Sequence, residues 1–226
     1  MRTLMQIAED ARRSKYAVAK LGTNDKNRGI LAIADTLMAH ADEIIAANRI
    51  DIENGRAAGL NDGLIDRLML DEKRIAGIAE GCRQVAALPD PVGEVLWMHK
   101  RPNGLNIGQK RVPMGVIGII YEARPNVTVD AAVLCFKAGS ACILRGGKEA
   151  FRSNNAIAEV LRDAIESAGL PRDSVQLVQD TSRASSVELM GMTEYLDLLI
   201  PRGGAGLIRS VVENATVPVI ETGTGN

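Results

Sequence analysis

Two short apolar runs, separated by a stretch of helical length, constrain the fold of this chain more than any other feature. They cover residues 116–121 and 141–144, and Gly and Pro residues bound them. Continuous apolar runs of this kind are typical of strands buried on both faces of a parallel sheet. We therefore expect a βαβ unit with a right-handed crossover. Ligands of such sheets bind at the carboxyl ends of the strands.

The chain that follows repeats this alternation of apolar runs and helical segments. Further strands are predicted at 175–179, 196–200 and 217–220, and helices at 127–138, 153–168, 182–192 and 204–214. Strands that alternate with helices in this way indicate a Rossmann-like, doubly wound α/β fold with a parallel sheet. Only 3% of the residues are aromatic whereas 46% are apolar, so the core is expected to be aliphatic.

Residues 1–93 are predicted to form helices that pack on this sheet. Their apolar residues recur at helical spacing, and Thr23-Asn24-Asp25 and Asp71 supply N-cap residues. Amphipathic helices of this kind need a larger body to pack against, so we interpret them as scaffold.

Residues 94–112 have a different pattern, in which Asn103-Gly104 separates two strand-like runs. Asn-Gly between such runs is a strong signal for a β-hairpin. A two-stranded hairpin is only marginally stable in water by itself. We therefore expect this hairpin to pair with another part of the molecule or with another subunit. Residues 113–226 are assigned to the sheet domain.

Charge and composition exclude several classes of function. The 27 Lys and Arg residues are offset by 28 Asp and Glu residues, and a net charge of −1 attracts neither nucleic acid nor an anionic membrane. The three cysteines form no paired motif and the two histidines lie far apart, so no metal site is predicted. No apolar run approaches the roughly 18 residues of a membrane helix. The first residues do not resemble a signal peptide, so we expect a soluble, cytoplasmic protein.

The first candidate site lies at the end of the strand predicted at 141–145. Arg145, Gly146, Gly147 and Lys148 form a turn in which the glycines let the backbone approach a ligand. The two cations can donate to a phosphate or to a ribose hydroxyl. The turn is not a Walker loop, because the upstream glycine and the Ser or Thr of that motif are missing. The alternative is a solvated turn with two surface cations.

A second turn of this kind follows the run at 196–200. Arg202, Gly203 and Gly204 precede a predicted helix, whose first turn offers free N–H groups and the positive end of the helix dipole to an anion. The dipole contributes about 0.3–1 kcal/mol, and up to ~2 kcal/mol when partly buried, so it assists binding without creating a site. The usual G-x-G-x-x-G motif is not formed, and a plain strand-to-helix turn is the alternative.

Polar residues also follow the first and last predicted strands. The guanidinium group of Arg124 suits a carboxylate or a phosphate, and Glu122 lies two residues before it. Asn126 can either cap the following helix or donate its amide to an oxyanion. Glu221 closes the run at 217–220, where it is either a site residue or an ordinary surface acid.

Four strings in these turns resemble gamma-glutamyl phosphate reductase, a branch of the aldehyde dehydrogenase superfamily. They are Tyr-Glu-Ala-Arg-Pro-Asn-Val-Thr from residue 121, Leu-Arg-Gly-Gly-Lys-Glu-Ala from 144, Ile-Pro-Arg-Gly-Gly from 200 and Val-Ile-Glu-Thr-Gly-Thr-Gly-Asn from 219. The likeness covers essentially the whole chain. The family it resembles reduces gamma-glutamyl phosphate with NADPH in proline synthesis. Its members have a cofactor domain, a catalytic domain and a β-extension for oligomerisation.

The resemblance implies a role for each candidate residue. It assigns the cofactor site to Arg145, Gly146, Gly147, Lys148, Arg202, Gly203, Gly204 and Glu221. Arg145 and Lys148 would contact the adenosine ribose and its 2′-phosphate, which favours NADP(H) over NAD. Glu122 and Arg124 would contact the substrate, gamma-glutamyl phosphate. Asn126 loosely matches the oxyanion-hole asparagine of the superfamily.

The resemblance also implies a part that this chain does not supply. The family's nucleophile is a cysteine thiolate that forms a thioester, which hydride then reduces. Neither Cys135, in a predicted helix, nor Cys142, in a predicted strand, matches it. The sequence stops in a glycine-rich turn, so we expect the cofactor-binding part of a longer enzyme, inactive alone.

The hairpin at 94–112 matches half of the family's oligomerisation extension and implies a homo-oligomer, a dimer or larger. Two alternatives stay open. One is a non-catalytic module that docks on full-length subunits. The other is an aldehyde dehydrogenase of another substrate branch.

Overall fold

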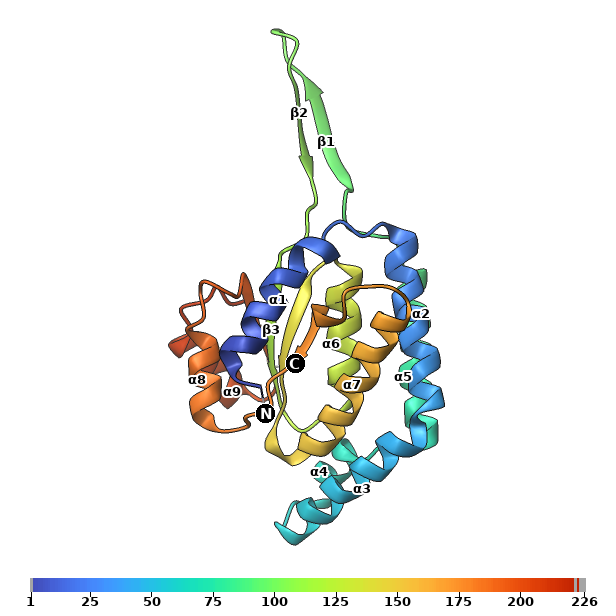
Figure 1. Ribbon diagram of the computed structural model, residues 1–226. Helices are drawn as coiled ribbons and strands as arrows, with labels where there is room; N and C mark the ends of the chain where they lie inside the picture. The colour runs from blue at the N-terminus through green and yellow to red at the C-terminus, as the bar shows by residue number, and fades with distance from the viewer. Residues whose placement is uncertain (1, 222, 224–226) are drawn as a thin grey trace.

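A computed structural model of the chain describes residues 2–221 and residue 223. Its main sheet is parallel, with the strand order β5-β4-β3-β6, and helices cover both faces (Figure 1). The strands are β3 (Val116–Tyr121), β4 (Ala141–Arg145), β5 (Val175–Leu177) and β6 (Leu198–Arg202). The chain runs outward from β3 through β4 to β5, and then crosses to place β6 on the other side of β3. This arrangement confirms the predicted doubly wound α/β fold.

The side chains of each strand alternate between two hydrophobic cores, one on each face of the sheet. In β3, Ile117 and Ile119 belong to one core, whereas Val116 and Ile120 belong to the other. The first core lies under α6 (Asn126–Lys137) and α7 (Phe151–Ser167), and the second under α1 (Leu4–Val18), α8 (Arg183–Met190) and α9 (Ala205–Asn214). Each fully buried aliphatic side chain contributes roughly 1.5–3 kcal/mol, so both layers stabilise the sheet.

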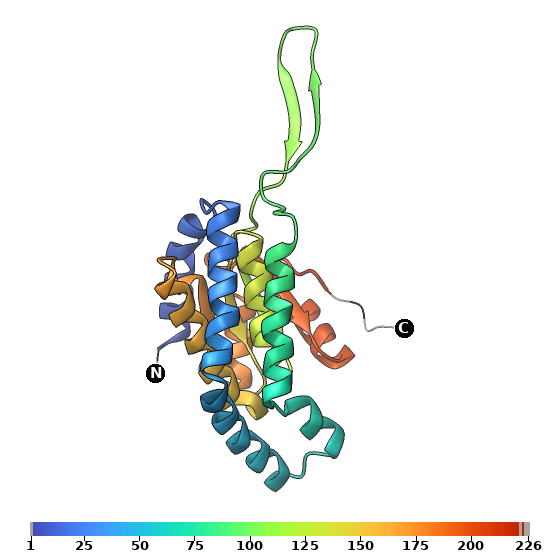
Figure 2. The ribbon, with the colours of Figure 1, turned by 90° about the vertical axis from the view of Figure 1, so that its right-hand side faces the viewer.

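Further helices form a second layer outside α6 and α7. They are α2 (Thr23–Ala39), α3 (Ala41–Ala57) and α5 (Glu72–Ala87). Figure 2 shows α2 and α5 side by side along α6. A side chain at Gly29 of α2 would lie 2.7 Å from Leu170 and 3.0 Å from Phe136, so the glycine allows close packing. The amino-terminal helices therefore share one core with the sheet.

The hairpin β1 (Val95–Lys100) and β2 (Asn106–Lys110) projects from the rest of the molecule (Figure 1). Its strands pair with each other, and all of their residues are exposed. Gly104 has a φ of 87°, which a glycine adopts without strain. The predicted hairpin is thus confirmed, and it does not pair with the described body of the chain.

Buried polar contacts fix the base of this hairpin. Lys26 of α2 is 1% exposed, and its ammonium group lies 2.6 Å from Asp90 Oδ1. The other Asp90 oxygen accepts from the Thr23 hydroxyl at 2.8 Å, and the Val92 N–H donates to Oδ1 at 3.0 Å. One carboxylate thus connects α2 to the segment that leads into β1.

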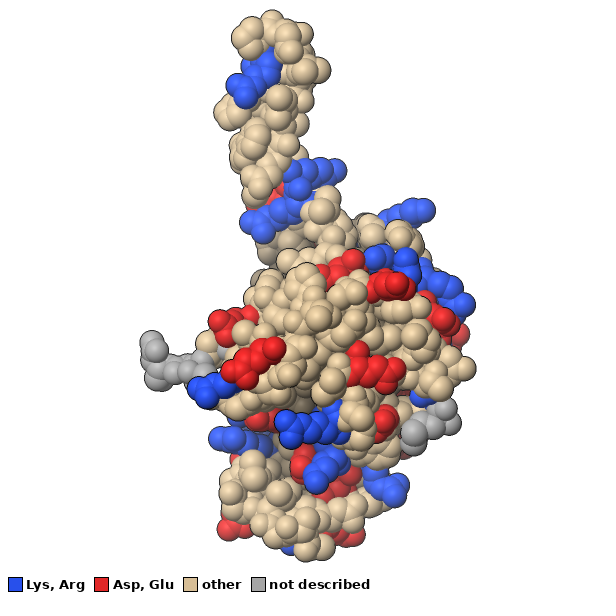
Figure 3. Space-filling view, turned by 90° about the vertical axis from the view of Figure 1, so that its left-hand side faces the viewer, with Lys and Arg blue, Asp and Glu red and all other residues tan. Residues whose placement is uncertain are grey.

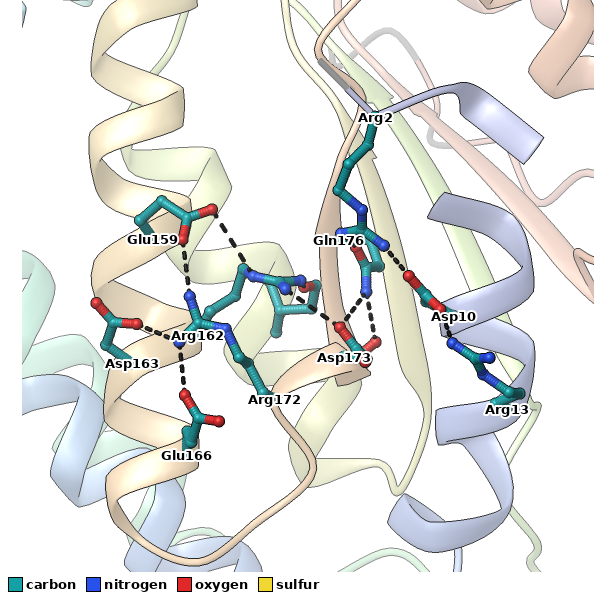
Figure 4. A network of polar contacts seen from close by, with 11 residues as sticks. Arg2, Asp10, Arg13, Glu159, Arg162, Asp163, Glu166, Arg172, Asp173 and Gln176 are labelled. Atoms are coloured by element: carbon teal, nitrogen blue, oxygen red, sulfur yellow. Dashed lines mark hydrogen bonds and ion pairs between the residues drawn. The ribbon is translucent and has the colours of Figure 1, made fainter. Parts of the chain in front are cut away.

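A charged network connects the outer strand β5 with its neighbouring helices (Figure 4). Arg172, in the short 3₁₀ helix η2 (Arg172–Ser174), contacts three carboxylates of α7: those of Glu159, Asp163 and Glu166. On the other side of β5, Arg2 pairs with Asp10 and donates to Gln176 Oε1 at 2.8 Å.

Several element boundaries differ from the sequence prediction. Helix α2 begins after Gly22, so the N-cap is not in the Thr23-Asn24-Asp25 stretch. Helix α7 begins two residues before the predicted helix at 153–168, and within it the Ser153 hydroxyl donates to the buried Asp51 carboxylate of α3 at 2.6 Å. The predicted strand at 217–220 forms only a single bridge, between Val219 and Leu199.

Two further differences concern short segments. Strand β6 begins two residues later than predicted, because the Leu196 N–H is bound to the Met192 carbonyl at 2.9 Å in the preceding turn. The helix α4 (Asp62–Leu68) was not predicted. A second 3₁₀ helix, η1 (Lys148–Ala150), follows the turn after β4.

Candidate functional site

A cavity of about 390 Å³ opens at the carboxyl edge of the parallel sheet. Its wall includes four residues at the ends of β3 and β4 that the sequence singled out: Glu122, Arg124, Arg145 and Gly147. The chain reverses its direction of winding between β3 and β6. Open α/β sheets bind their ligands beside such a switch point, so the cavity lies where the fold class expects a ligand.

The glycine turns after β4 and β6 lie on either side of Glu122. A side chain at Gly147 would lie 3.4 Å from the Glu122 carbonyl carbon, and one at Gly203 would lie 2.7 Å from its carboxyl carbon. The absence of side chains at Gly147 and Gly203 therefore makes room for Glu122, and it does not leave an empty space. The two turns therefore belong to one surface, as a single elongated ligand requires.

The start of α9 is already occupied by a carboxylate. Glu122 Oε1 accepts a hydrogen bond from the Gly204 N–H at 2.9 Å. The sequence prediction of free N–H groups therefore does not hold for Gly204 in the ligand-free chain. The first turn of a helix favours any anion, because its N–H groups lack intrahelical partners. Glu122 is the anion that occupies this position.

Arg145 is oriented by backbone carbonyls of the loop between β5 and α8. Its guanidinium group donates to the carbonyls of Thr181 at 2.7 Å and Ser182 at 2.9 Å, while the buried Nε has no partner. Burial lowers the pKa of Arg145, and nearby Asp180 and Glu149 oppose this effect. Arg145 therefore holds the loop and keeps one buried donor unused.

The other two residues of this turn differ in environment. Gly146 is buried, and a side chain there would overlap the Asn154 amide and lie 3.1 Å from the Tyr121 ring. Internal packing thus explains this glycine. Lys148 is exposed in η1, where its carbonyl accepts from the Phe151 N–H, and its side chain forms no hydrogen bond or ion pair with the described residues.

Asn126 lies next to the cavity but does not line it. It is the first residue of α6 and makes no side-chain cap, so the expected capping role is wrong. Its amide donates to Asp130 Oδ2 at 3.0 Å. Burial raises the pKa of Asp130, although this hydrogen bond and Arg202 oppose the shift. Asn126 and Asp130 line an adjacent cavity of about 340 Å³.

Two predicted site residues lie outside the main cavity. Arg202 pairs in register with Tyr121 at the end of β6, yet it lines a different cavity, between α5 and α6. Glu221 is exposed beyond the bridge at Val219 and does not line the 390 Å³ cavity. The structure therefore does not bring these two side chains together with Arg145.

Part of the cavity wall comes from a region that the sequence suggested was only scaffold. Leu60, Leu64 and Arg67, in and before α4, line the cavity beside Arg124. Figure 3 shows Lys and Arg side chains along the waist between the rounded body and the α3–α4 lobe below it. No local sequence signal places these residues at the cavity, because α4 has only seven residues.

The three cysteines are buried, reduced and away from this cavity. Burial raises the pKa of Cys82 to about 12. Interaction with the Cys135 thiol and burial both raise the pKa of Cys142. A nucleophilic cysteine needs a lowered pKa and access to its substrate, so packing explains these thiols. No group of three metal-binding side chains occurs within residues 2–221.

The cavity and the glycine turns lie at the carboxyl edge of a doubly wound sheet. Comparison of the whole sequence with models of known families shows which family has this arrangement. The model of the aldehyde dehydrogenase family matches residues 2–223. This chain belongs to the aldehyde dehydrogenase family. Membership implies a nicotinamide cofactor.

Two curated relatives both have the name of one branch of the family, gamma-glutamyl phosphate reductase. The chain is 57% identical to a gamma-glutamyl phosphate reductase of Heliobacterium modesticaldum, over 96% of this chain and 52% of that protein. It is 55% identical to one of Lachnospira eligens, over 100% of this chain and 54% of that protein. The chain thus spans about half the length of the curated relatives it matches.

Solved structures show the same relationship. A gamma-glutamyl phosphate reductase of Thermotoga maritima is 45% identical with a TM-score of 0.97, covering 100% of this chain and 54% of that one. The protein of that name from Saccharomyces cerevisiae is 32% identical with a TM-score of 0.87, covering 97% and 56%. A probable aldehyde dehydrogenase of Listeria monocytogenes, at 14% identity and a TM-score of 0.76, shares the fold.

Proposed function

We propose that this chain forms the cofactor-binding half of a gamma-glutamyl phosphate reductase. The reaction is the NADPH-dependent reduction of gamma-glutamyl phosphate to glutamate-5-semialdehyde, in proline biosynthesis. The observation that carries the proposal is the placement of the Gly147 and Gly203 turns on either side of Glu122, beside a cavity at the switch point of the sheet. The names of the relatives support the substrate.

The residues present fit a dinucleotide phosphate. Gly203 and Gly204 would support the pyrophosphate at the start of α9 once Glu122 is displaced. Arg145, which lines the cavity, and the exposed, unpaired ammonium group of Lys148 would contact the ribose and its 2′-phosphate. When bound, NADPH supplies the hydride; the chain's residues hold and orient it.

Other assignments belong to the proposal as well. Arg124 lines the cavity where the acyl substrate would lie. Asn126 would turn its amide from Asp130 to act as an oxyanion donor. The three buried thiols do not supply the nucleophile, so the reductase needs a cysteine from outside the described residues.

The proposal includes a cytoplasmic location and assembly into a homo-oligomer. Among the described helices, none is long and apolar enough to cross a membrane. The exposed hairpin strands carry apolar side chains, including Trp97 and Met98. These side chains fit a role in subunit association. In this proposal the chain consists of helices at 1–93, an association hairpin at 94–112 and the cofactor-binding domain at 113–226.

Lys148→Ala provides the sharpest test of the proposed cofactor. Because the Lys148 side chain has no partner among the described residues, its loss should leave the fold intact. A charge-assisted hydrogen bond contributes roughly 1.5–3 kcal/mol, so NADPH should bind about tenfold to a hundredfold more weakly, and NADH should be unaffected. Fluorescence titration of both cofactors measures this. Equal NADPH affinities for the wild type and the variant would contradict the assignment, and Lys73→Ala, a change at an exposed residue of α5 that does not line the cavity, serves as the control.

A further inference from the structure

Helix α4 presents one face to the core and another to the cavity. Ile65 and Leu68 are buried, at 7% and 0% exposure. Leu60, Leu64 and Arg67 line the cavity instead. Residues three or four positions apart lie on the same side of a helix, so Leu64 and Arg67 form one stripe. Arg67 is the cation of that stripe.

Arg67 has no partner, because the neighbouring carboxylate is used elsewhere. Asp66 Oδ1 lies 2.5 Å from Arg74 Nη2 of α5. Arg74 also donates to the Met69 carbonyl at 2.9 Å, so it is fixed at the end of α4. Within residues 2–221, the Arg67 guanidinium group forms no hydrogen bond or ion pair.

Arg124 lines the same cavity and is unpaired in a similar way. The nearest carboxylate in sequence, Glu122, accepts from the Gly204 N–H instead. The Arg124 N–H donates to the Glu122 carbonyl at 2.7 Å, which fixes the backbone of the loop. Its guanidinium group makes no hydrogen bond or ion pair with the described part of the chain.

The cavity has one more arginine than carboxylates, and its two carboxylates are engaged away from Arg67 and Arg124. Three arginines line it, and its carboxylates are Glu122 and Glu149. Arg145 is held by backbone carbonyls and attracted by Glu149, while Glu122 is bound at α9. Two unpaired guanidinium groups on one cavity repel each other and favour an anion between them.

We propose that Arg67 and Arg124 together bind the carboxylate at the amino-acid end of the acyl substrate. This inference rests on the proposed function, because gamma-glutamyl phosphate carries a carboxylate at one end and the reacting acyl phosphate at the other. Guanidinium groups bind carboxylates through paired N–H donors. Leu60 and Leu64 provide an apolar wall for the methylene groups between the two ends. Arg67 thus becomes a specificity-determining residue.

Protection of arginines from chemical modification tests this pair. Phenylglyoxal reacts with accessible guanidinium groups, and peptide mass spectrometry gives the rate at each arginine. With saturating L-glutamate as the probe, modification of Arg67 and Arg124 should slow roughly fivefold, as expected for charge-assisted contacts. Arg56, an exposed arginine of α3 that does not line the cavity, is the internal control and should react at an unchanged rate.

Variants at Arg67 show whether the two arginines act together. In Arg67→Gln, L-glutamate should no longer protect Arg124, because one guanidinium group alone holds the carboxylate weakly. Arg67→Lys keeps the charge and should restore part of the protection. Full protection of Arg124 in Arg67→Gln would overturn the inference. Equal protection of Arg56, or no protection at all, would overturn it too.

An NADPH arm separates this inference from the proposed function. NADPH should bind Arg67→Gln and the wild type within about twofold, because Arg67 contacts the substrate. If NADPH protected Arg67 as strongly as L-glutamate, the pair would belong to the cofactor site and the inference would fail. If NADPH did not bind even the wild type, the proposed cofactor would fail, while protection by L-glutamate would still decide the role of the pair.

Discussion

Single residues at the base of the hairpin show how this chain uses buried charge. The ammonium group of Lys26 is removed from water and depends on Asp90 for its partner. Lys137 lies in the same region, and burial lowers its pKa although Asp90 opposes the shift. Two buried cations close to one carboxylate make Asp90 the residue whose loss is most costly there.

Asp90→Ala should lower the free energy of unfolding by about 3–5 kcal/mol, because it leaves Lys26 buried and unpaired. Asp35→Ala is the matched control. Asp35 pairs with Arg83 at 2.9 Å but is 76% exposed, so its loss should cost less than about 1 kcal/mol. Urea unfolding of both variants at pH 7 measures the difference. Similar losses would show that the Lys26 pair is weak.

The pH dependence of the same pair follows from the pKa of Asp90. Burial alone would raise this pKa, but hydrogen bonds from Lys26, Val92 and Thr23 outweigh it and hold the pKa below 3.8. The folded chain therefore binds this proton less tightly than the unfolded chain. The stabilisation by Asp90 is complete above its ordinary pKa and is lost as the pH falls through the folded value. The difference in unfolding free energy between the wild type and Asp90→Asn, measured by urea unfolding, should therefore shrink as the pH falls from above the ordinary pKa through the folded pKa of Asp90.

At the scale of elements, α4 is the segment that contributes cavity residues not predicted from the sequence. It has seven residues and is positioned by the turn before it, where Gly59 has a φ of 77° and the Leu60 N–H donates to the Gly55 carbonyl at 3.0 Å. Its first turn is capped by the Asn61 side chain, which accepts from the Leu64 N–H at 2.9 Å.

Asn61→Ala should loosen α4, because removal of an N-cap side chain costs about 1 kcal/mol of helix stability. Hydrogen exchange should become faster at the α4 amides and stay unchanged in α6. Asn24→Ala is the control: Asn24 lies in a stretch expected from its sequence to cap α2, but the structure places the cap at Gly22. That variant should leave exchange in α2 unchanged. Equal effects of the two variants would argue against a capping role for Asn61.

The elements also show how far sequence reasoning reaches. The strands β3 and β4 and the Asn103-Gly104 hairpin are predictable, because their signals are local: apolar runs and a turn dipeptide. Helix α4 is too short for a periodic pattern. Leu60 and Arg67 reach the cavity only through tertiary packing of α3 and α4, and no local signal places them beside Arg124. The same holds for Glu122, whose bond to Gly204 joins residues far apart in the sequence.

At the scale of the whole molecule, the projecting hairpin is the surface through which we propose that copies of the chain associate. Trp97 and Met98 are 43% and 61% exposed on β1, and water is a poor environment for such side chains. A double variant, Trp97→Ser with Met98→Ser, should shift the chain from an oligomer towards a monomer without a change in its melting temperature. Light scattering after size exclusion measures the mass. Tyr16→Ser, a change at a residue of α1 that is 62% exposed, should leave the mass unaltered; a monomeric wild type would contradict this role of the hairpin.

The two margins of the parallel sheet are unequal. The outer strand β5 has only three residues, and Arg2, Asp10 and Arg172 place charge beside it (Figure 4). Short length and flanking charge are features that block the addition of a neighbouring strand. Beyond β6, by contrast, Val219 already touches Leu199. Strand addition is therefore disfavoured at β5, and the β6 side of the sheet is the one at which the chain itself adds a further pairing.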